Sequence, residues 1–265
     1  MIDDNQEKLS FEYNNFGEDI QGKRIHSKYL VRSKVHTLMY KSVVDCVKPA
    51  SSIVDLGCGD GGLTFLLTSK SSNVMGMDIS EFNINLAQER YRTKKGITFE
   101  IGDVCDTKFK DNEFEVSVSH HVLEHLSDFS QGLIELKRIT NKSIYICLPT
   151  ANSPISWTLL GGGNYWKHGK LGTVRLLKGL IRTVVGFLQG KIGIDEGSYS
   201  SLENVPHIFF FPKRISTIMN CSEWQVVHHQ PQVTGLPWIA RSIKIGSKKS
   251  VGGLGTIFTL ERISN

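Results

Sequence analysis

Apolar and polar residues follow two different periods along this chain. Short apolar runs of strand length occur at "SIVDL", "NVMGMDIS", "ITFEIGDV", "FEVSVSH" and "SIYICLP", and apolar residues at helical spacing lie between them. Residues 24–47 form the first helical stretch, and "EFNINLAQERYRTKK" begins after Ser80 and stops near Gly96. "WQVVHHQ" and "GTIFTLERI" are two further strands near the C-terminus. Strands that alternate with helices predict a mostly parallel sheet with helices on both faces.

This alternation breaks at Pro149. The following residues are rich in glycine and basic side chains, and regular patterning resumes at "FPKRISTIMNC". We expect the intervening insertion to lie over the carboxyl edge of the sheet, where folds of this kind bind ligands. The chain is therefore divided into an N-terminal helical segment (1–48), a cofactor-binding core (49–149), a substrate or lid insertion (150–205) and the C-terminal part of the core sheet (206–265).

The stretch "IVDLGCGDGG" joins the first strand to the next helix through a turn of glycines. Gly57, Gly59 and Gly62 satisfy the spacing G-x-G-x-x-G, a short motif that needs further support. Glycine accepts positive φ and lets a ligand approach the backbone closely. A strand, a glycine turn and a helix in this order predict a nucleotide-type site.

Three carboxylates distinguish between the nucleotides that such a site can hold. Asp78, at the end of "VMGMD", stands about 20 positions after the glycines, where a carboxylate accepts both ribose hydroxyls. Asp55 precedes the glycines, where a carboxylate repels a pyrophosphate but suits a ligand with an amino group. Asp103, in "IGDV", is placed to accept from an exocyclic amine. These positions disfavour a dehydrogenase.

With "SVSHHVLEHLSD" after the fourth strand, the chain resembles the class I S-adenosylmethionine-dependent methyltransferases, in particular the broad small-molecule group that includes ubiquinone-biosynthesis-like enzymes. The resemblance rests on "VDLGCGDGG", "GMDIS", "GDVCD" and "HHVLEHL" and covers residues 50–150 well. It implies a Rossmann-like α/β fold with a seven-stranded, mostly parallel sheet. It also implies S-adenosylmethionine as cofactor and S-adenosylhomocysteine as product.

The same resemblance implies which residues contact the cofactor. A glycine loop passes under the methionine and ribose parts, and three acids bind the ammonium group, the ribose and the adenine amine. In these motifs the positions are Asp55 for the ammonium, Gly57, Gly59 and Gly61 for the loop, Asp78 for the ribose, Ile79 for the adenine face, Asp103 and Val104 for the adenine amine, and His120 for the methionine. Arg32, on the predicted N-terminal helix, is a further candidate for the cofactor carboxylate.

Histidines are the candidate catalytic residues. A base is needed only for a hydroxyl or a protonated amine, because the cofactor is already activated, and histidine suits that role near neutral pH. The candidates are His121, His125 and His207, with His168 available from the insertion. A histidine in "LEHL" also caps or packs readily, and Glu124 is expected to orient the loop. No metal site is expected, since ligand-like spacing is confined to the "HHVLEH" run.

Charge is distributed unevenly along the chain. Residues 136–265 contain 16 Lys and Arg but five Asp and Glu, and no carboxylate occurs from Leu136 to Ile194. A long segment of one sign predicts an anionic partner, and charges that simply surround the protein are the alternative. In "TVRLLKGLIRTVVGFL", Arg175, Lys178 and Arg182 form a basic stripe on an apolar helix. Such a helix either meets a membrane surface or a phosphorylated, lipid-like substrate, or packs its apolar side on the domain as a lid.

The first hypothesis of function is methyl transfer to a small, lipid-linked or glycan-linked anionic acceptor, at oxygen rather than nitrogen. One alternative is an RNA methyltransferase, although no Asn-Pro-Pro-Tyr type of motif follows the fourth strand. The other is a non-catalytic cofactor-binding protein that docks on a membrane through residues 174–188. The polar, acidic N-terminus and the lack of a long apolar run indicate a cytoplasmic protein, with peripheral membrane contact as an option.

Overall fold

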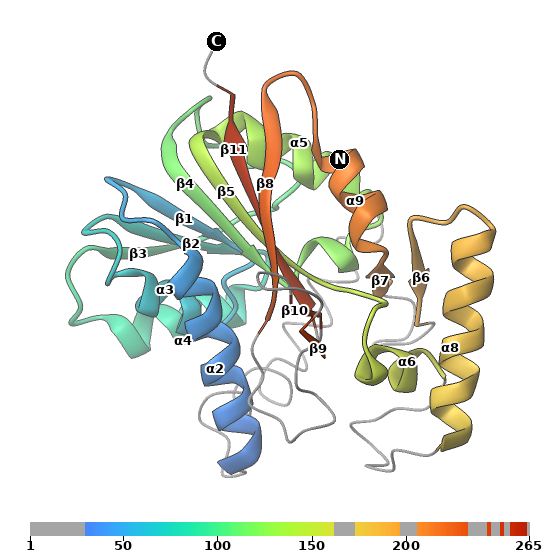
Figure 1. The fold of residues 1–265 in the computed structure, drawn as a ribbon. Coiled ribbons are helices and arrows are strands. Elements are labelled where there is room, and N and C mark those ends of the chain that lie inside the picture. Colours follow the sequence, from blue (N-terminus) through green and yellow to red (C-terminus); the bar gives the residue numbers. More distant parts are fainter. Residues whose placement is uncertain are drawn as a thin grey trace.

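The computed structural model describes residues 30–161, 173–196, 206–232, 243–244, 250–251 and 255–263. Its centre is a seven-stranded sheet with the order β3-β2-β1-β4-β5-β11-β8 (Figure 1). The first five strands run parallel to their neighbours, whereas β11 is antiparallel to both β5 and β8. The strands are β1 (Ile53–Leu56), β2 (Val74–Asp78), β3 (Ile97–Ile101), β4 (Phe114–His120), β5 (Thr140–Pro149), β8 (Trp224–Pro231) and β11 (Gly255–Arg262). The predicted Rossmann-like, mostly parallel sheet is confirmed.

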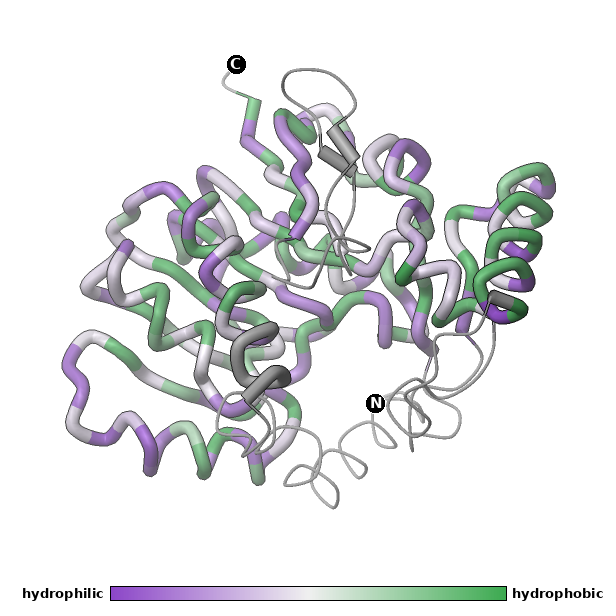
Figure 2. The backbone as a smooth tube through the Cα atoms, turned by 60° about the horizontal axis from the view of Figure 1, so that its bottom comes forward, coloured by the Kyte–Doolittle hydropathy of each residue, from purple (hydrophilic) through white to green (hydrophobic). Residues whose placement is uncertain are grey.

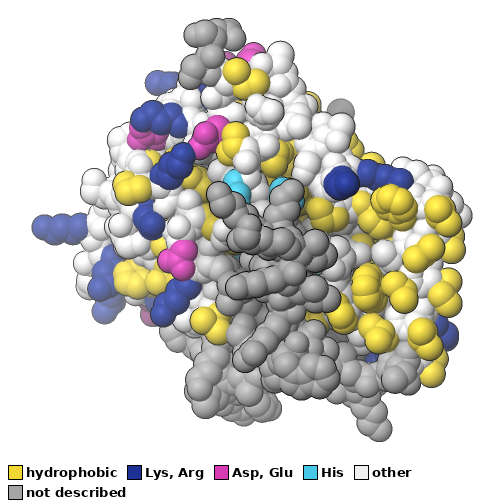
Figure 3. All heavy atoms as spheres, in the orientation of Figure 1, with side chains coloured by type: hydrophobic (Ala, Val, Ile, Leu, Met, Phe, Trp, Pro, Cys, Tyr) yellow, Lys and Arg dark blue, Asp and Glu magenta, His cyan; other side chains and the backbone are white. Residues whose placement is uncertain are grey.

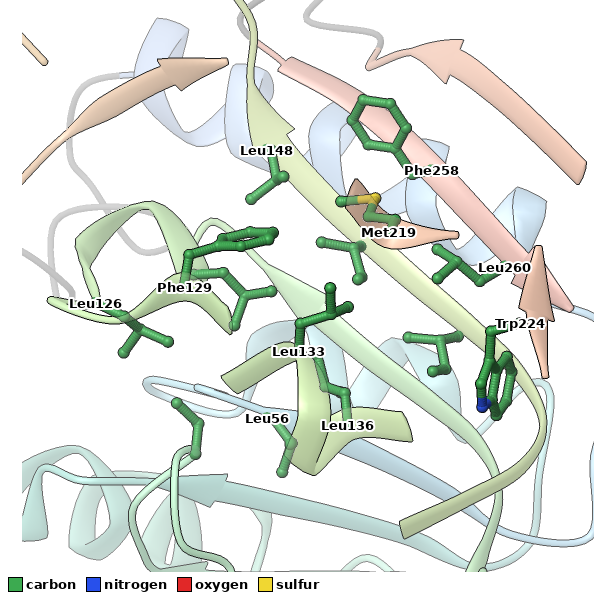
Figure 4. Close-up of a cluster of buried hydrophobic side chains, with 14 of the residues drawn as sticks. Leu56, Leu126, Phe129, Leu133, Leu136, Leu148, Met219, Trp224, Phe258 and Leu260 are labelled. Carbon is green, nitrogen blue, oxygen red and sulfur yellow. The ribbon is translucent and has the colours of Figure 1, made fainter. Parts of the chain in front are cut away.

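Side chains along the central strands point alternately into two hydrophobic cores, as the strand period of two requires. Ile53 packs with α2 and α3 on one face, whereas its neighbour Val54 belongs to the core on the other face. That second core lies under α5 and α9 and includes the buried Leu133 and Trp224 (Figure 4). The helices of the core are α2 (Leu30–Cys46), α3 (Gly62–Leu67), α4 (Glu81–Tyr91), α5 (Phe129–Ile139) and α9 (Pro212–Met219). The sheet therefore has helices on both faces.

The helix α4 begins where the sequence predicts. The hydroxyl of Ser80 accepts a hydrogen bond from the backbone N–H of Asn83, so Ser80 is the N-cap. The helix ends at Tyr91, earlier than the predicted stop, and Gly96 takes a φ of 76° just before β3. This cap fixes the chain directly after Asp78, which the site uses.

The insertion after β5 has a small core of its own. It contains α6 (Pro154–Leu160), α8 (Thr173–Leu188) and β6 (Gly193–Asp195). Because β6 pairs antiparallel with β7 (Ile208–Phe210), its small sheet continues beyond residue 205. The buried apolar residues between these elements are Ala151, Leu159, Leu160, Ile194, Phe209 and Phe211. Two short strands, β9 (Ile243–Lys244) and β10 (Ser250–Val251), form a separate antiparallel pair that belongs neither to the insertion nor to the seven-stranded sheet.

The helix α8 turns its small residues inward. A Cβ added at Gly179 would lie 1.5 Å from the backbone oxygen of Trp157, so α6 and α8 touch through their backbones. A Cβ added at Gly186 would lie 3.0 Å from Cγ1 of the Ile194 side chain in β6. The guanidinium of Arg182 donates to the backbone oxygens of Leu160 and Asp195. The glycines of this helix are therefore required by its close contact with α6 and β6.

The apolar side of α8 consequently faces outward (Figure 2). Its exposed apolar residues, each between 44% and 78% accessible, are Val174, Leu177, Ile181, Val184, Val185 and Leu188. The alternative of a lid helix that packs its apolar side on the domain is therefore wrong. Among the described residues, no helix has the length and apolar character needed to span a bilayer.

Candidate active site at the carboxyl edge of the sheet

The turn after β1 (residues 57–61), which we call the glycine cradle, has no room for a side chain at Gly57 or Gly61. Gly57, Gly59 and Gly61 all take positive φ, at 77°, 53° and 76°. A Cβ at Gly57 would lie 2.2 Å from Cγ2 of Val122, and one at Gly61 would lie 2.7 Å from the ring of Phe99. Both the backbone conformation and the space therefore demand glycine. The turn is tied to β2, since the N–H of Gly57 donates to the backbone oxygen of Met77 over 2.7 Å.

Asp78 ends β2 beside this turn. One oxygen of its carboxylate accepts from the N–H of Gly59 over 2.8 Å, and the other accepts from the N–H of Ser80 over 2.9 Å. These two bonds join the glycine turn to the start of α4 and fix the direction of the carboxylate. Ile79, between them, is half-buried. The structure thus places the predicted ribose acid directly at the glycine turn.

Asp55 is a buried acid with an unsatisfied oxygen. Burial raises its pKa to about 7; the hydroxyl of Thr64, which donates to Oδ2 over 2.7 Å, acts in the opposite direction, and nearby Asp78 adds to the rise. Oδ1 has no hydrogen-bond partner within the described part of the chain. A buried polar atom without a partner is costly, so Oδ1 is a ready acceptor for an amino group of a ligand.

The remaining predicted cofactor residues lie along the same edge. Asp103 follows β3, where its Oδ1 accepts from the N–H of Cys105 over 2.8 Å, and Val104 beside it is buried. Arg32 belongs to the first turns of α2, and the placement of its side chain lies outside the described residues. His168 also lies outside them.

The loop after β4 begins with a backbone outlier. His121 has a φ of 55°, which is uncommon for a residue other than glycine. Residues with such a backbone conformation occur preferentially at functional sites. Its Nδ1–H donates over 2.8 Å to Oε1 of Glu124, which is fully buried in the single turn η1 (Leu123–His125). Burial alone would lower the pKa of His121, but the neighbouring Cys147 and Glu124 hold it well above its usual range. The raised pKa favours the protonated form of His121, and a protonated imidazole is a poor acceptor of protons.

Gln232 extends this pair into a chain of polar groups. Its Oε1 accepts from Nε2–H of His121 over 3.0 Å, and its Nε2 donates to Nε2 of His120 over 2.5 Å. Gln232 is buried at the end of β8, more than 100 residues away in sequence. No motif marks this glutamine, and the sequence could not have identified it.

The insertion brings a second histidine pair to the same loop. Nδ1–H of His125 donates to the backbone oxygen of Pro206 over 2.8 Å, and burial lowers the pKa of His125 to about 4. His207 donates through Nδ1–H to Oε2 of Glu196 over 2.6 Å. The rings of His125 and His207 stack with centroids 5.1 Å apart. All three predicted catalytic histidines therefore gather near the end of β4.

Glu196 was missed by the sequence analysis, although a signal for it exists. Asp195 and Glu196 are the first carboxylates after the long acid-free segment. Both contact His207: Oδ1 of Asp195 accepts from its backbone N–H over 3.3 Å, while Glu196 binds the ring. In this structure the two acids that end the segment orient His207.

Two groups of ligand-type side chains meet in this region. One group is His120, His121 and Cys147, and the other is Glu124, His125 and His207; the ligand atoms of each group lie within 4.8 Å of one another. Zinc bonds are about 2 Å long and need lone pairs that converge on one point. The rings of His125 and His207 are nearly parallel, at 14°, so their lone pairs do not converge. The expectation of no metal remains a prediction.

Comparison with known proteins identifies the core of the fold. Residues 54–148 match a family model described as a methyltransferase domain. An uncharacterised methyltransferase of Schizosaccharomyces pombe is 32% identical over 116 residues, which is 40% of this chain and 42% of that protein. The demethylmenaquinone methyltransferase of Staphylococcus carnosus is 29% identical over 125 residues, 46% of this chain and 52% of that protein. The chain thus spans about half the length of these curated relatives.

A solved structure extends the similarity of fold to nearly the whole chain. The magnesium protoporphyrin IX methyltransferase of Synechocystis, crystallised with S-adenosylhomocysteine, superposes with a TM-score of 0.58 at 15% identity. The match covers 96% of this chain and 98% of that protein. These matches show that residues 54–148 are a methyltransferase domain and that the chain has the fold of a methyltransferase crystallised with S-adenosylhomocysteine.

Proposed function

We propose that this protein is an S-adenosylmethionine-dependent methyltransferase that methylates an oxygen atom of a small, lipid-linked or glycan-linked anionic acceptor. The observation that carries the proposal is the meeting of a glycine cradle, an unsatisfied buried carboxylate and two histidine pairs at one edge of the sheet. The cradle and the carboxylate suit the cofactor, and the histidine pairs suit an acceptor that must lose a proton.

The residues of the cradle fit the cofactor chemically. Oδ1 of Asp55 is an acceptor for the ammonium group, and the carboxylate of Asp78 is fixed where a ribose can donate to it. The three glycines of the turn take positive φ, and a residue without a side chain lets a ligand approach the backbone closely. When bound, the cofactor supplies a methyl group that is already activated on a sulfonium centre. The protein then has to align the two reactants and exclude water.

Asp78→Ala tests the cofactor site. We expect the affinity for S-adenosylmethionine and S-adenosylhomocysteine to fall by about 1–3 kcal/mol, the usual cost of unpairing buried polar groups, as measured by calorimetric titration. The control is Asp106→Ala, because Asp106 is an exposed acid paired with Lys108 beyond the end of β3. Unchanged affinity in Asp78→Ala, or no binding to the parent protein, would contradict the proposal.

His207 is the base that the geometry favours. The raised pKa of His121 favours its protonated form, and His125, with a pKa of about 4, is a weak base at neutral pH. In His207 the bond from Nδ1–H to Oε2 of Glu196 fixes the tautomer in which Nε2 carries the lone pair that can accept a proton. The ion pair of His121 and Glu124 then holds the loop after β4, which lies between the cofactor site and the proposed base His207. We therefore assign it a positioning role.

His207→Gln should separate catalysis from binding. We expect kcat to fall about 100-fold, the lower range for loss of a general base, while the affinity for S-adenosylmethionine is unchanged. The rate of S-adenosylhomocysteine release measures the first quantity and calorimetry the second. The matched control is His228→Gln, since His228 is exposed on β8 and should leave both unchanged. Equal kcat in His207→Gln and His228→Gln would remove His207 from the mechanism.

The acceptor class is supported by charge and by similarity. The half of the chain that contains the insertion has an excess of 11 basic residues over acidic ones, which favours an anionic acceptor. The matched enzyme of Staphylococcus carnosus is named for a quinone lipid. The test is incubation with methyl-labelled cofactor and separate lipid, glycan and RNA fractions. Label in lipid or glycan supports the proposal, label in RNA supports the alternative substrate, and cofactor binding without any labelled product supports the non-catalytic role.

A further inference from the structure

The outer face of α8 is a continuous apolar surface. Figure 3 shows hydrophobic side chains gathered over the place that α8 occupies in Figure 1. Ile181, Val184 and Leu188 are 62%, 49% and 78% exposed, at spacings of three and four that place them on one side of the helix. Ile192, also exposed, extends the surface past the end of the helix, and Phe187, near that end, is 52% exposed and contacts the ring of Phe211. We call these residues, with Val174, Leu177 and Val185, the α8 face.

Basic side chains line one border of the α8 face. Lys178 and Arg182 lie on the helix between its apolar side and its glycine side, and both are exposed. Lys191 follows the helix and is exposed, and Arg214 of α9 lies over the ring of Phe187 at 4.4 Å. No carboxylate occurs in α8 or in the residues that lead from β5 to it. The surface is therefore apolar in the middle and cationic at its edge.

The α8 face is also held rigidly. The backbone contact of Gly179 with α6 fixes the middle of the helix, and Arg182 ties it to Leu160 and Asp195. At the other end, Arg214 donates to the backbone oxygens of Phe187 and Lys191. A helix mounted in this way cannot rotate its apolar side inward without breaking these contacts.

We propose that the α8 face docks on the surface of an anionic lipid bilayer. A helix of 16 residues is about 24 Å long, too short to cross the hydrocarbon core but suited to lie in the interface. Its apolar side then enters the boundary between headgroups and acyl chains, and Lys178 and Lys191 meet the lipid phosphates.

A second copy of this chain fits the α8 face less well. A two-fold contact between two α8 helices would bring their basic borders into one interface, with no acidic side chain on either helix to pair with them. An anionic surface supplies the missing negative charge instead. Charge complementarity thus favours the bilayer.

Docking would also place the candidate site next to the bilayer. Gly186 of α8 packs on Ile194 of β6, and Glu196 follows that strand and binds His207. The insertion that contacts the membrane therefore supplies Glu196, the residue that orients the proposed base His207. In this respect the inference rests on the proposed function and narrows the acceptor to a lipid-borne one.

Vesicle binding tests the α8 face without any acceptor. Cosedimentation uses vesicles of phosphatidylcholine with 30% phosphatidylglycerol, and pure phosphatidylcholine for comparison. We expect the parent protein to prefer the anionic vesicles, with binding that weakens at high salt. Ile181→Gln/Val184→Gln should reduce partitioning at least tenfold. The matched control is Ile134→Gln/Val227→Gln, because Ile134 and Val227 are 58% and 51% exposed but lie on α5 and β8.

Each outcome decides the inference. Loss of binding in the α8 pair but not in the control pair, with unchanged circular dichroism and unchanged cofactor affinity, supports docking. Absence of binding by the parent protein, or equal loss in both pairs, overturns it. A dimer that the α8 pair converts to a monomer in sedimentation velocity, without vesicle binding, would assign the face to a second copy. Cofactor titration on the same samples separates failure of docking from failure of the proposed function.

Discussion

Asp55→Asn should make the ligand-free protein more stable and deprive it of most of its affinity for S-adenosylmethionine. The buried carboxylate of Asp55 has a raised pKa of about 7 because burial disfavours its charged form. Its Oδ1 has no hydrogen-bond partner among the described residues, so the cost of burial is not offset until a ligand donates to it. At pH 8 we expect the free energy of unfolding to rise by about 1–3 kcal/mol, measured by urea denaturation, because asparagine removes the charge but still buries an amide.

The pH dependence of the parent protein follows from the same shift. Since the folded pKa of Asp55 lies above its ordinary value of 3.8, the folded chain keeps a proton that the unfolded chain loses between about pH 4 and 7. The contribution of Asp55 to stability therefore decreases as pH rises through this window, by up to about 4 kcal/mol. Cofactor affinity should change in the opposite direction, because the ammonium group binds the ionised carboxylate. It should rise from pH 6 to 7.5 in the parent protein and stay flat in Asp55→Asn.

Glu135→Gln is the control variant, for which we expect a change in stability of opposite sign to that of Asp55→Asn. Glu135 is also buried, but Thr107 and Arg138 satisfy it, and despite its burial they hold its pKa below the usual range. Its replacement should lower stability at neutral pH and leave cofactor affinity unchanged. If Asp55→Asn behaved like Glu135→Gln, or retained full affinity, Oδ1 of Asp55 could not be the ammonium acceptor.

Local sequence determines most of the fold and of the cofactor site. The strands and most core helices follow from periodicity, and Gly57, Asp55 and Asp78 come together because the strands that precede them are adjacent in the sheet. Because the glycine turn and the end of β2 are close in sequence, the cofactor site can be predicted without knowledge of contacts between distant residues. The same reasoning predicted three histidines at one site, since two of them belong to a single loop.

The rest of the site depends on contacts between distant segments. Gln232 reaches His121 from the far end of the chain, and nothing in its neighbours indicates a polar chain. The orientation of α8 is a second example. Its apolar pattern left open whether that side is buried on the domain or faces a partner, but contact of Gly179 with the backbone of α6 is possible only with the glycine side inward. A pattern of apolar residues shows that a helix has two sides, and packing decides which of them faces the protein.

Gly57→Ala should abolish cofactor binding, whereas Gly190→Ala should not affect it. Both glycines take nearly the same φ, 77° and 79°, so alanine pays the same left-handed conformational cost of about 1–2 kcal/mol at either position. A Cβ at Gly190 has no atom within 4 Å, but one at Gly57 would lie 2.2 Å from a methyl group of Val122. Overpacking of this kind adds about 1–3 kcal/mol. Because Val122 adjoins His121, its displacement would disturb both the cradle and the loop.

The difference in stability and affinity between the two glycine variants therefore measures the effect of the close contact with Val122, because the backbone cost is the same in both. We expect Gly57→Ala to lower the free energy of unfolding by about 2–5 kcal/mol, by urea denaturation, and to reduce cofactor affinity more than 100-fold, by calorimetry. Gly190→Ala should lose about 1–2 kcal/mol of stability at full affinity. Equal affinities in the two variants would mean that Val122 yields to the new methyl group without moving the loop. The cradle would then be shaped by the bonds of Gly57 and Gly59 to β2 and not by its contact with the loop after β4.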